Sequence, residues 1–381
     1  MSGPAQIAHT RASLRQLRRF MVTATITLLT LMLLTTFLMP FVYMLATATK
    51  EPQQISNPAA PIWPSREATF TYEGEEATFP IVFRDRAGTT KEGTVTIKPD
   101  EAYPLYRVPV EGTNRRLALV AKRPEESFFL DPSHPEAGLV KWEGKWQTLK
   151  PAFIFDPHWQ NFRVAWREIG FPILLRNTLA IAILGDIGTL LSCIAVAYGF
   201  SRFRIPGKNL IFYVLIGTII LPLYVTMIPT YALFTRIGWN GTWLPLIVPH
   251  FFANAYNVFL LRQFFLTIPR ELDEAAMIDG ASPLRTLTSV ILPQSIPAVV
   301  SVGLFHFFWA WNDFFGPLLY LLGKPKLQPI SLGIQTYNAL YSNQPHMIQA
   351  TALMGLALPV VIFFLAQRAF MRGVVITGVE K

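Results

Sequence analysis

The amino-acid sequence predicts an all-α polytopic membrane protein of six transmembrane helices, with a small β domain inserted outside the cytoplasm. The first reason is composition: 51% of the 381 residues are hydrophobic and only 15% are charged, whereas soluble domains carry roughly 25% charged residues. The second is a set of six long apolar segments, and the third is a stretch of alternating apolar and polar residues between the first two. The single Cys193 excludes a disulfide framework and a Cys-based zinc site.

Six segments are long and apolar enough to cross a membrane. Crossing about 30 Å of hydrocarbon takes roughly 20 mostly apolar residues at 1.5 Å each. The first segment follows four arginines, but its apolar stretch is longer than the roughly 7 to 15 residues of a signal peptide, so we expect a retained helix. The six expected spans are Phe20–Leu45, Leu174–Phe200, Leu210–Ala232, Leu244–Phe264, Ser295–Leu319 and Met347–Phe370.

The placement of Lys and Arg predicts the orientation. With six spans, both termini lie on the same side of the membrane. The two termini and the loops 202–208 and 262–285 together hold 13 Lys and Arg, and the opposite side holds five outside the inserted segment. Because positive residues favour the cytoplasmic side, we expect a multi-pass protein of the cell inner membrane with both termini in the cytoplasm. The formal charge of +9 is then explained by contact with anionic lipid and by membrane orientation rather than by nucleic-acid binding.

The segment 51–165 has the composition of a small soluble domain, between a membrane region at 1–50 and another at 166–381. Residues 51–170 hold 15 Lys and Arg against 17 Asp and Glu, a net charge of −2, and the rest of the chain has a net charge of +11. Alternation with a period of two, broken by Gly, Pro, Asp and Asn, predicts antiparallel strands. They are expected at Thr69–Tyr72, Ile81–Phe83, Thr94–Ile97 and Tyr106–Val110.

A hairpin is also expected in this segment, formed by Leu139–Trp142 and Lys145–Thr148 around Glu143-Gly144. Its two tryptophans, Trp142 and Trp146, offer flat faces that could stack on a sugar ring. Paired aromatic residues on a hairpin more often pack against each other across the strands. Packing is therefore the favoured interpretation, with sugar stacking as the alternative.

The loop between the fourth and fifth expected spans predicts two short helices. Within residues 267–280, Pro269 suits a first turn, Gly280 suits the end of a helix, and the acidic residues of the first turns complement the positive end of its dipole. A second short helix fits Ser282–Val290, before Pro293 opens the fifth span. Two such helices at a right angle would present a rigid knob to a cytoplasmic partner.

The stretch EAAMIDGASPLRTLTSVILP within this loop resembles the EAA loop of ABC importer permeases, although Val290 stands where Ile is usual. Further segments are similar to the permeases of carbohydrate importers of the maltose-transporter type. The inserted segment 51–165 departs from that branch, which has a short first external loop. The similar segments are Arg176–Thr178, Phe203–Gly207, Trp311–Phe314, Pro329–Gly333 and Gln367–Gly373.

The resemblance implies the fold of an ABC type I importer permease and a role as a transmembrane subunit of an ATP-driven, binding-protein-dependent carbohydrate importer. The partners it implies are a second permease in a heterodimer, two ATPase subunits and an extracytoplasmic solute-binding protein. The EAA loop, at 268–293, would dock into an ATPase subunit and couple its closure to the spans. The implied coupling residues are Glu274, Ala275, Ala276, Asp279, Gly280, Leu292 and Pro293.

No cofactor, metal site or catalytic residue is expected on this chain. A Walker loop requires Gly-x-x-x-x-Gly-Lys-Ser/Thr, and neither Gly207-Lys208 nor Gly323-Lys324 continues into a hydroxyl residue. We therefore expect ATP and Mg to be bound by the partner ATPase subunits. The chain is expected to be a translocation subunit rather than an enzyme.

Two places in the spans carry polar side chains that could face a substrate pathway. Asp186 lies near the middle of the second span, where a carboxylate costs about 2.5 to 3.5 kcal/mol and must face protein or water. An interhelical hydrogen bond is an equally good interpretation of Asp186. Trp311, Asn312 and Asp313 combine an aromatic face with hydrogen-bonding groups in the outer half of the fifth span. The alternative for Asp313 is capping of a helix break before Gly316-Pro317.

Two other classes of protein compete with the importer. A membrane-anchored receptor or assembly factor would use the β domain as its working part and would function without an ATPase. An ion-coupled secondary transporter would show an internal repeat, and the two halves of this sequence show none. The identity of the sugar and the role of the inserted segment are not encoded in any motif.

Overall fold

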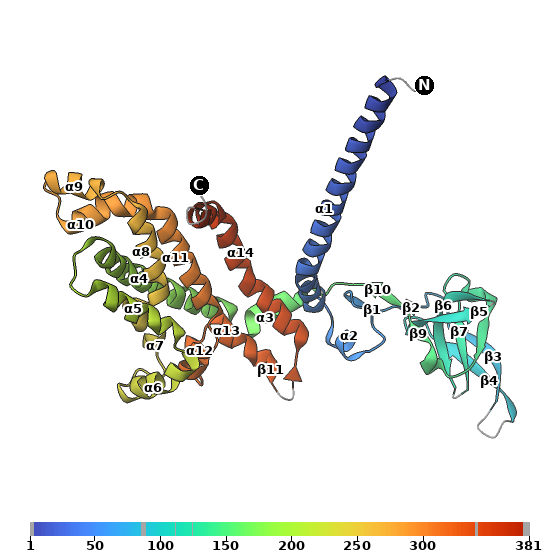
Figure 1. Ribbon diagram of the computed structural model, residues 1–381. Coiled ribbons are helices and arrows are strands. Elements are labelled where there is room, and N and C mark those ends of the chain that lie inside the picture. The colour runs from blue at the N-terminus through green and yellow to red at the C-terminus, as the bar shows by residue number, and fades with distance from the viewer. Residues whose placement is uncertain (1–3, 85–88, 111, 124, 340–341, 376–381) are drawn as a thin grey trace. The chain divides into compact units, whose positions relative to one another are not determined.

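The computed structural model describes residues 4–84, 89–110, 112–123, 125–339 and 342–375 (Figure 1). The chain divides into two compact units, one up to Asn161 and one from Phe162 onward. The first unit contains the long helix α1 (Pro4–Ala48), the short helix α2 (Pro52–Ser56) and the β region. Within its described residues, the second unit is helical apart from the short paired strands β11 (Asn338–Ala339) and β12 (Ser342–Asn343).

Helix α1 has the length and apolar composition of a membrane span. Its span, Arg18–Ala48, is apolar and its side chains are exposed along almost the whole length. The hydroxyls of Thr25, Thr30 and Thr35 each donate to the carbonyl four residues earlier at 2.8 Å. Since lipid offers no hydrogen-bond partners, such local bonds satisfy polar side chains within the helix.

The β region is antiparallel throughout its described residues (Figure 1). A six-stranded sheet has the order β2-β5-β6-β7-β8 with β9 paired to β5, while β3 pairs β4 and β1 pairs β10. The core of the sheet is formed by Val108, Leu117 and Phe129, all nearly inaccessible to solvent. The strands are β1 (Ser65–Glu67), β2 (Thr69–Thr71), β3 (Ala77–Arg84), β4 (Thr90–Ile97), β5 (Ala102–Val110), β6 (Thr113–Lys122), β7 (Glu126–Leu130), β8 (Leu139–Glu143), β9 (Lys150–Pro151) and β10 (Phe153–Phe155).

The four expected strands are confirmed as β2, β3, β4 and β5, but the expected hairpin at Glu143-Gly144 is wrong. Strand β8 pairs with β7, and Trp146–Thr148 forms a 3₁₀ turn. Strand β8 pairs with the buried strand β7 along the whole length of β7. After Gly144 the chain leaves the sheet and enters the 3₁₀ turn instead of forming a second hairpin strand. Both Trp142 and Trp146 pack against the core of the sheet, but Trp146 lies in the 3₁₀ turn and packs on Tyr106, so the two do not form the expected cross-strand pair of a hairpin.

The second unit is organised around α4, which packs on α8 and α11 (Figure 1). Gly188 on α4 allows the 3₁₀ turn Val248–Phe251 to approach the same helix, because a Cβ at Gly188 would lie 2.6 Å from the ring of Phe251. The helices are α3 (Gln160–Glu168, which contains the boundary between the units), α4 (Phe171–Arg202), α5 (Lys208–Gly217), α6 (Leu223–Arg236), α7 (Leu244–Ile247), α8 (Ala255–Thr267), α9 (Glu271–Ile278), α10 (Pro283–Thr286), α11 (Leu292–Asn312), α12 (Phe315–Leu321), α13 (Ile330–Gly333) and α14 (Pro345–Val375).

Two of the sequence segments that resemble carbohydrate permeases contact each other at the start of α4. The Asn177 amide donates to the carbonyls of Lys326 and Gln328, both at 2.9 Å. The Thr178 hydroxyl accepts from the amide of Ile330 at 2.9 Å. These bonds fasten the loop before α13 to α4, which explains why polar residues occupy buried positions at the beginning of an apolar helix.

Five of the helices in the described residues are long and apolar enough to cross a membrane. They are Arg18–Ala48, Phe171–Arg202, Leu244–Thr267, Pro283–Asn312 and Pro345–Gln367. The segment expected as the third span is instead two helices, Lys208–Ile220 and Tyr224–Arg236, which meet at 98°. The bend falls at Pro222, whose ring removes a backbone donor and restricts the preceding residue.

Two expectations about the fifth span are corrected. The second short helix of the EAA loop does not end before the span: Pro283–Asn312 runs as one helix, with a π-helical turn at Leu287–Ile291. Pro293 has no N–H for the carbonyl four residues earlier, and a wider turn accommodates this loss. The span also ends at Asn312 rather than Leu319, since Asp313 leaves the helical conformation.

Candidate functional site

The EAA loop folds around a sharp turn at Gly280 that follows α9. Gly280 has φ of +78°, a conformation that side-chain-bearing residues rarely adopt. The amides of Gly280 and Ala281 donate to the carbonyls of Met277 and Ala276 at 3.0 and 2.8 Å, which satisfies the last carbonyls of α9. Ser282 then caps α10 by accepting from the amide of Arg285. The expected bend at Gly280 is therefore present.

A buried ion pair holds α9 against the end of α4. Arg202 Nε lies 3.0 Å from Asp273 Oδ2, and these side chains are only 7% and 13% exposed. The Arg202 guanidinium also donates to the carbonyl of Ile268 at 3.0 Å. Asp273 Oδ1 is buried without a hydrogen-bond partner in the described residues, so the pair depends on the single Arg202 contact. Breaking such a buried pair by removing one partner costs about 3–5 kcal/mol.

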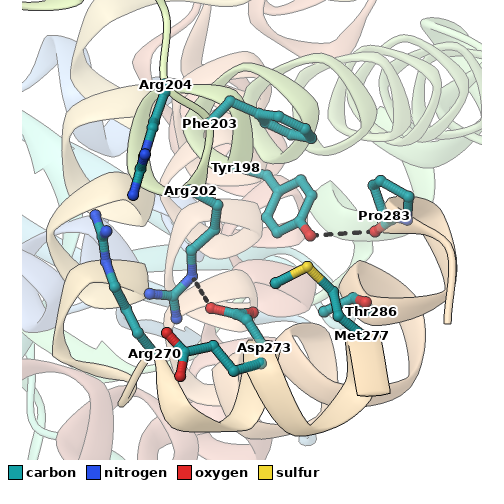
Figure 2. Close-up of a pocket in the computed structure, with 10 residues that line it drawn as sticks. Tyr198, Arg202, Phe203, Arg204, Arg270, Asp273, Met277, Pro283 and Thr286 are labelled. Atoms are coloured by element: carbon teal, nitrogen blue, oxygen red, sulfur yellow. Dashed lines mark hydrogen bonds and ion pairs between the residues drawn. The ribbon is translucent and has the colours of Figure 1, made fainter. Parts of the chain in front are cut away.

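A second bond joins α4 to α10. The hydroxyl of Tyr198, one helical turn before Arg202, donates to the carbonyl of Pro283 at 3.1 Å. Figure 2 shows this hydroxyl directed at Pro283 while the Arg202 guanidinium is directed at Asp273. Both short segments of the EAA loop are thus fixed to the same end of α4.

These contacts surround a pocket of about 260 Å³ (Figure 2). Its walls combine cations and anions with the apolar side chain of Met277. Beyond the pocket, Ile278 and Leu284 are large apolar residues that the unit leaves exposed, and exposed apolar groups with a polar rim are typical of protein interfaces. The pocket is lined by Tyr198, Arg202, Phe203, Arg204, Arg270, Asp273, Glu274, Met277, Pro283 and Thr286.

The residues of the EAA motif fall into an outward and an inward group. Glu274, Ala275, Asp279 and Gly280 are exposed, and Ala276 is buried against the unit. Glu274 also lines the pocket. Leu292 is half-buried and Pro293 exposed, both at the beginning of α11.

Two cavities lie along α11, away from the EAA loop. The larger, of about 650 Å³, has Asn312, Asp313, Trp309 and His250 among its lining residues. The smaller, of about 370 Å³, shares His250 and Trp309 and adds Asn257 and other residues of α8 and α11. In the described part of the chain, no group of three or more His, Cys, Asp or Glu side chains is placed to hold a metal ion.

Comparison with known proteins decides the family. The family of binding-protein-dependent transport system inner membrane components matches residues 188–374, a range that includes the EAA loop. The sn-glycerol-3-phosphate transport system permease protein UgpE of Pectobacterium atrosepticum is 32% identical over 225 residues, which cover 57% of this chain and 79% of that relative. This chain belongs to that family. The resemblance found in the sequence is confirmed.

Two further comparisons extend the match. An osmoprotective compounds uptake permease protein of Synechocystis is 27% identical to the permease over 279 residues, covering 72% of this chain and 93% of the relative. A solved bacterial ABC transporter involved in the import of the acidic polysaccharide alginate aligns with a TM-score of 0.50 and 22% identity, covering 58% of this chain and 81% of that one. The permease therefore has the fold of a multi-pass ABC importer subunit.

The pathway residues expected from the sequence do not all lie together in the permease. Asn312 and Asp313 line the larger cavity, and Asp313 Oδ1 also accepts from the amide of Gly316 at 3.1 Å, as the capping alternative expects. Trp311 is buried, packs on Phe307 and donates its indole N–H to the carbonyl of Gly355 at 3.2 Å. Its contacts are those of a core residue.

Asp186 lies between α4 and α11, opposite Gly303. A Cβ at Gly303 would lie 3.3 Å from Asp186 Oδ2, and Asp186 Oδ1 is buried without a hydrogen-bond partner in the described residues. Nearby on the same two helices, Thr189 shares a hydrogen bond of 3.2 Å with His306. The expected interhelical hydrogen bond is thus made by Thr189 rather than by Asp186.

Sequence reasoning missed several residues that the structure brings to these sites. Arg202 and Tyr198 are distant in sequence from the EAA loop and show no local signal. Trp309 and His250 line both cavities, but an aromatic residue and a histidine in apolar helices look like core residues. A polar or amphipathic residue within an apolar span is the sequence feature that could have identified them. The same feature would also have identified Asn257, which lines the smaller cavity.

Proposed function

We propose that this permease forms half of the translocation pathway of an ATP-driven carbohydrate importer. It would pair with a second permease in a heterodimer, dock two ATPase subunits through the EAA loops, and receive its substrate from an extracytoplasmic solute-binding protein. ATP would be hydrolysed on the partner subunits. The observation that carries the proposal is the pair of contacts, Arg202–Asp273 and Tyr198–Pro283, that fixes the EAA loop to α4 while its other face stays exposed.

The exposed face of the EAA loop suits an ATPase partner in both charge and shape. Glu274 and Asp279 offer carboxylates, and Met277, Ile278 and Leu284 offer apolar side chains to a cleft. Since α9 and α10 are both bonded to the end of α4, a displacement of the loop would be carried into the span that packs on α8 and α11. A loop held only by its backbone ends would absorb the same displacement.

The two cavities support a polyhydroxylated substrate. The larger one combines the aromatic side chains of Trp309 and Tyr320 with the polar groups of His250, Asn312 and Asp313. Aromatic faces stack on the apolar faces of sugar rings, and the polar groups hydrogen-bond their hydroxyls. The named substrates of the relatives, sn-glycerol 3-phosphate and alginate, also carry several hydroxyls or acidic oxygens. Asp186 lines neither cavity, so it would affect the pathway only through its packing against Gly303 of α11.

Charge reversal at Glu274 tests the coupling role. In the assembled importer, we expect Glu274→Lys to reduce ATP-driven uptake at least about fivefold. An anionic loop is expected to contact basic groups of the ATPase subunit, and the new lysine would repel them. The matched control is Glu271→Lys, which makes the same change at an exposed position of α9 outside the pocket. Uptake and subunit co-purification are measured together.

Two results would contradict the coupling role of Glu274. Normal uptake by the Glu274→Lys importer would remove it from the interface. Equal losses for Glu274→Lys and Glu271→Lys would show a general charge effect on α9. Full function without any ATPase subunit would favour the receptor interpretation of the chain.

The proposed topology has six spans, with α5 and α6 together forming the third, both termini in the cytoplasm and the β region outside. We expect a cysteine at Val82, on β3, to react with an impermeant thiol reagent in intact cells, and one at Arg285, in the EAA loop, to react only after permeabilisation. Cys193 is buried and is replaced by alanine as background. The physical basis is the excess of Lys and Arg on one side, and the reversed labelling pattern would overturn the orientation.

A further inference from the structure

The chain that enters and leaves the β region is bonded directly to the end of α1. The amide of His158 donates to the carbonyl of Thr49 at 2.8 Å, and the Asn161 side-chain amide donates to the carbonyls of Ala48 and Lys50 at 2.8 and 2.9 Å. These bonds satisfy carbonyls that the end of a helix leaves unpaired. We call residues 49–65 and 154–161 the collar, because together they join the β region to α1.

Side-chain bonds fix the shape of the collar. The buried Gln54 donates to the carbonyls of Pro61 and Trp63 at 3.0 and 2.7 Å, and its oxygen accepts from the amide of Ser65 at 3.0 Å. The amide of Asp156 donates to the carbonyl of Pro64 at 3.2 Å. The two strands of the collar are therefore held together, and the backbone that carries Trp63 has a defined position.

Four large hydrophobic side chains of the collar are more than half exposed. Ile62 is 72% exposed, Trp63 57%, Phe155 69% and Trp159 59%. In the neighbouring sheet, by contrast, Tyr103 and Phe128 are buried and Phe129 is fully inaccessible. Four such residues on a segment of defined shape indicate a surface that contacts a membrane or another protein.

The length of the chain places this surface close to the end of the membrane span. Trp159 directly follows His158, whose amide is bonded to Thr49, immediately after the span. Phe155 is three residues before His158, so it lies within about 11 Å of that bond even if the chain is fully extended. The polar headgroup zone adds roughly 5–8 Å on each side of the hydrocarbon core. Trp and other amphipathic aromatic residues prefer this zone.

We propose that the collar lies in the headgroup region of the bilayer at the end of α1 and anchors the β region to the membrane surface. Ile62, Trp63, Phe155 and Trp159 are the residues that enter it. The only fully charged side chains of the collar are Lys50, Glu51 and Asp156, so the attraction is apolar and does not require anionic lipid. The anchor requires that α1 crosses the membrane, but not a particular substrate or orientation.

The consequence is mechanical. A domain joined to one helix end by two flexible strands would change its height and tilt freely, whereas aromatic side chains in the headgroup region limit both. The β region would then present the same face outward at a fixed distance from the bilayer. This is the condition under which a membrane-anchored domain can meet a large external partner repeatedly in one geometry.

Site-directed spin labelling of the full chain in the assembled transporter, in nanodiscs of neutral phosphatidylcholine, tests the anchor. In a Cys193→Ala background, nitroxides are placed by Ile62→Cys and, separately, Phe155→Cys; both variants keep Trp63 and Trp159. Collision rates are measured with oxygen, which concentrates in lipid, and with a nickel chelate, which stays in water. Val82→Cys, on an exposed apolar residue of β3, is the water control, and Leu34→Cys, in the middle of α1, is the lipid control.

We expect the oxygen-to-nickel ratio at residues 62 and 155 to be at least about threefold above that at residue 82 and below that at residue 34, as the headgroup zone requires. The same values should be found when anionic lipid is added. Ratios equal to that of residue 82 at both sites would overturn the proposal, since the collar would then be in water. Low collision rates with both reagents would also overturn it, because they show that protein covers the collar.

Discussion

Replacing Asp273 by alanine is expected to reduce ATP-driven uptake about 100-fold while the importer stays assembled in the membrane. The change leaves Arg202 buried and without its anionic partner, which costs about 3–5 kcal/mol, and each 1.4 kcal/mol changes an equilibrium tenfold. The cost is relieved when α9 detaches from α4. A detached EAA loop still carries its exposed face to the ATPase subunit but no longer moves the span. We expect ATP hydrolysis to continue without uptake, measured side by side in proteoliposomes.

A double variant tests whether the ion pair acts by holding α9 to α4 or through its charge. Arg202→Met combined with Asp273→Leu replaces the ion pair with apolar side chains of similar volume, an exchange that is often neutral in a protein interior. We therefore expect the double variant to recover most of the uptake that either single variant loses. If the double variant transported no better than Asp273→Ala, the pair would be needed for its charge and not for holding α9 to α4.

This ion pair illustrates which part of the site the sequence could reveal. The acidic residues at the beginning of α9 are recognisable locally, because carboxylates complement the positive end of a helix. Glu271 and Glu274 are indeed exposed there, but Asp273 turns inward to Arg202, which lies 71 positions earlier in the chain. No periodicity or spacing encodes such a pairing. The bend at Gly280, in contrast, depends on the backbone of one residue and could be predicted.

The fold shows the same division between local and tertiary causes. Long apolar segments identify α1, α4 and α14, since length and hydropathy are properties of the segment itself. The third expected span is equally apolar, yet it bends by 98° at Pro222, and apolar composition alone does not determine direction. The expected hairpin after β8 is wrong for a related reason, because pairing with β7 decides where that strand lies.

The pathway residues required a choice that periodicity cannot make. Trp309 and Trp311 are two residues apart on α11, and at 3.6 residues per turn they point to nearly opposite sides of the helix. The sequence motif draws attention to Trp311, which is followed by two polar residues. The structure places Trp311 against Phe307 and α14 and Trp309 beside both cavities. The two tryptophans should therefore fail in different ways.

Replacing Trp309 by alanine is expected to raise the substrate concentration needed for half-maximal uptake about tenfold without lowering the melting temperature. A half-exposed indole contributes little to the core, and the loss of one aromatic stacking partner costs about 0.5–1.5 kcal/mol. The conservative Trp309→Phe variant keeps an aromatic face and should stay within a few-fold of the native permease. Uptake is measured over a range of substrate concentrations. An unchanged half-saturation value for Trp309→Ala would remove this residue from the pathway.

Replacing Trp311 by alanine is expected to act on stability instead. The buried indole fills space beside Phe307, and its N–H satisfies the carbonyl of Gly355. Removing it leaves a cavity and an unpaired acceptor, and buried Trp to Ala changes cost about 3–5 kcal/mol. We expect a clear fall in melting temperature and in the amount of permease in the membrane, with the half-saturation concentration of the remaining transporters unchanged. The opposite outcome, native stability with weakened substrate affinity, would return Trp311 to the pathway and imply that α11 rotates during transport so that its two faces alternate at the cavity.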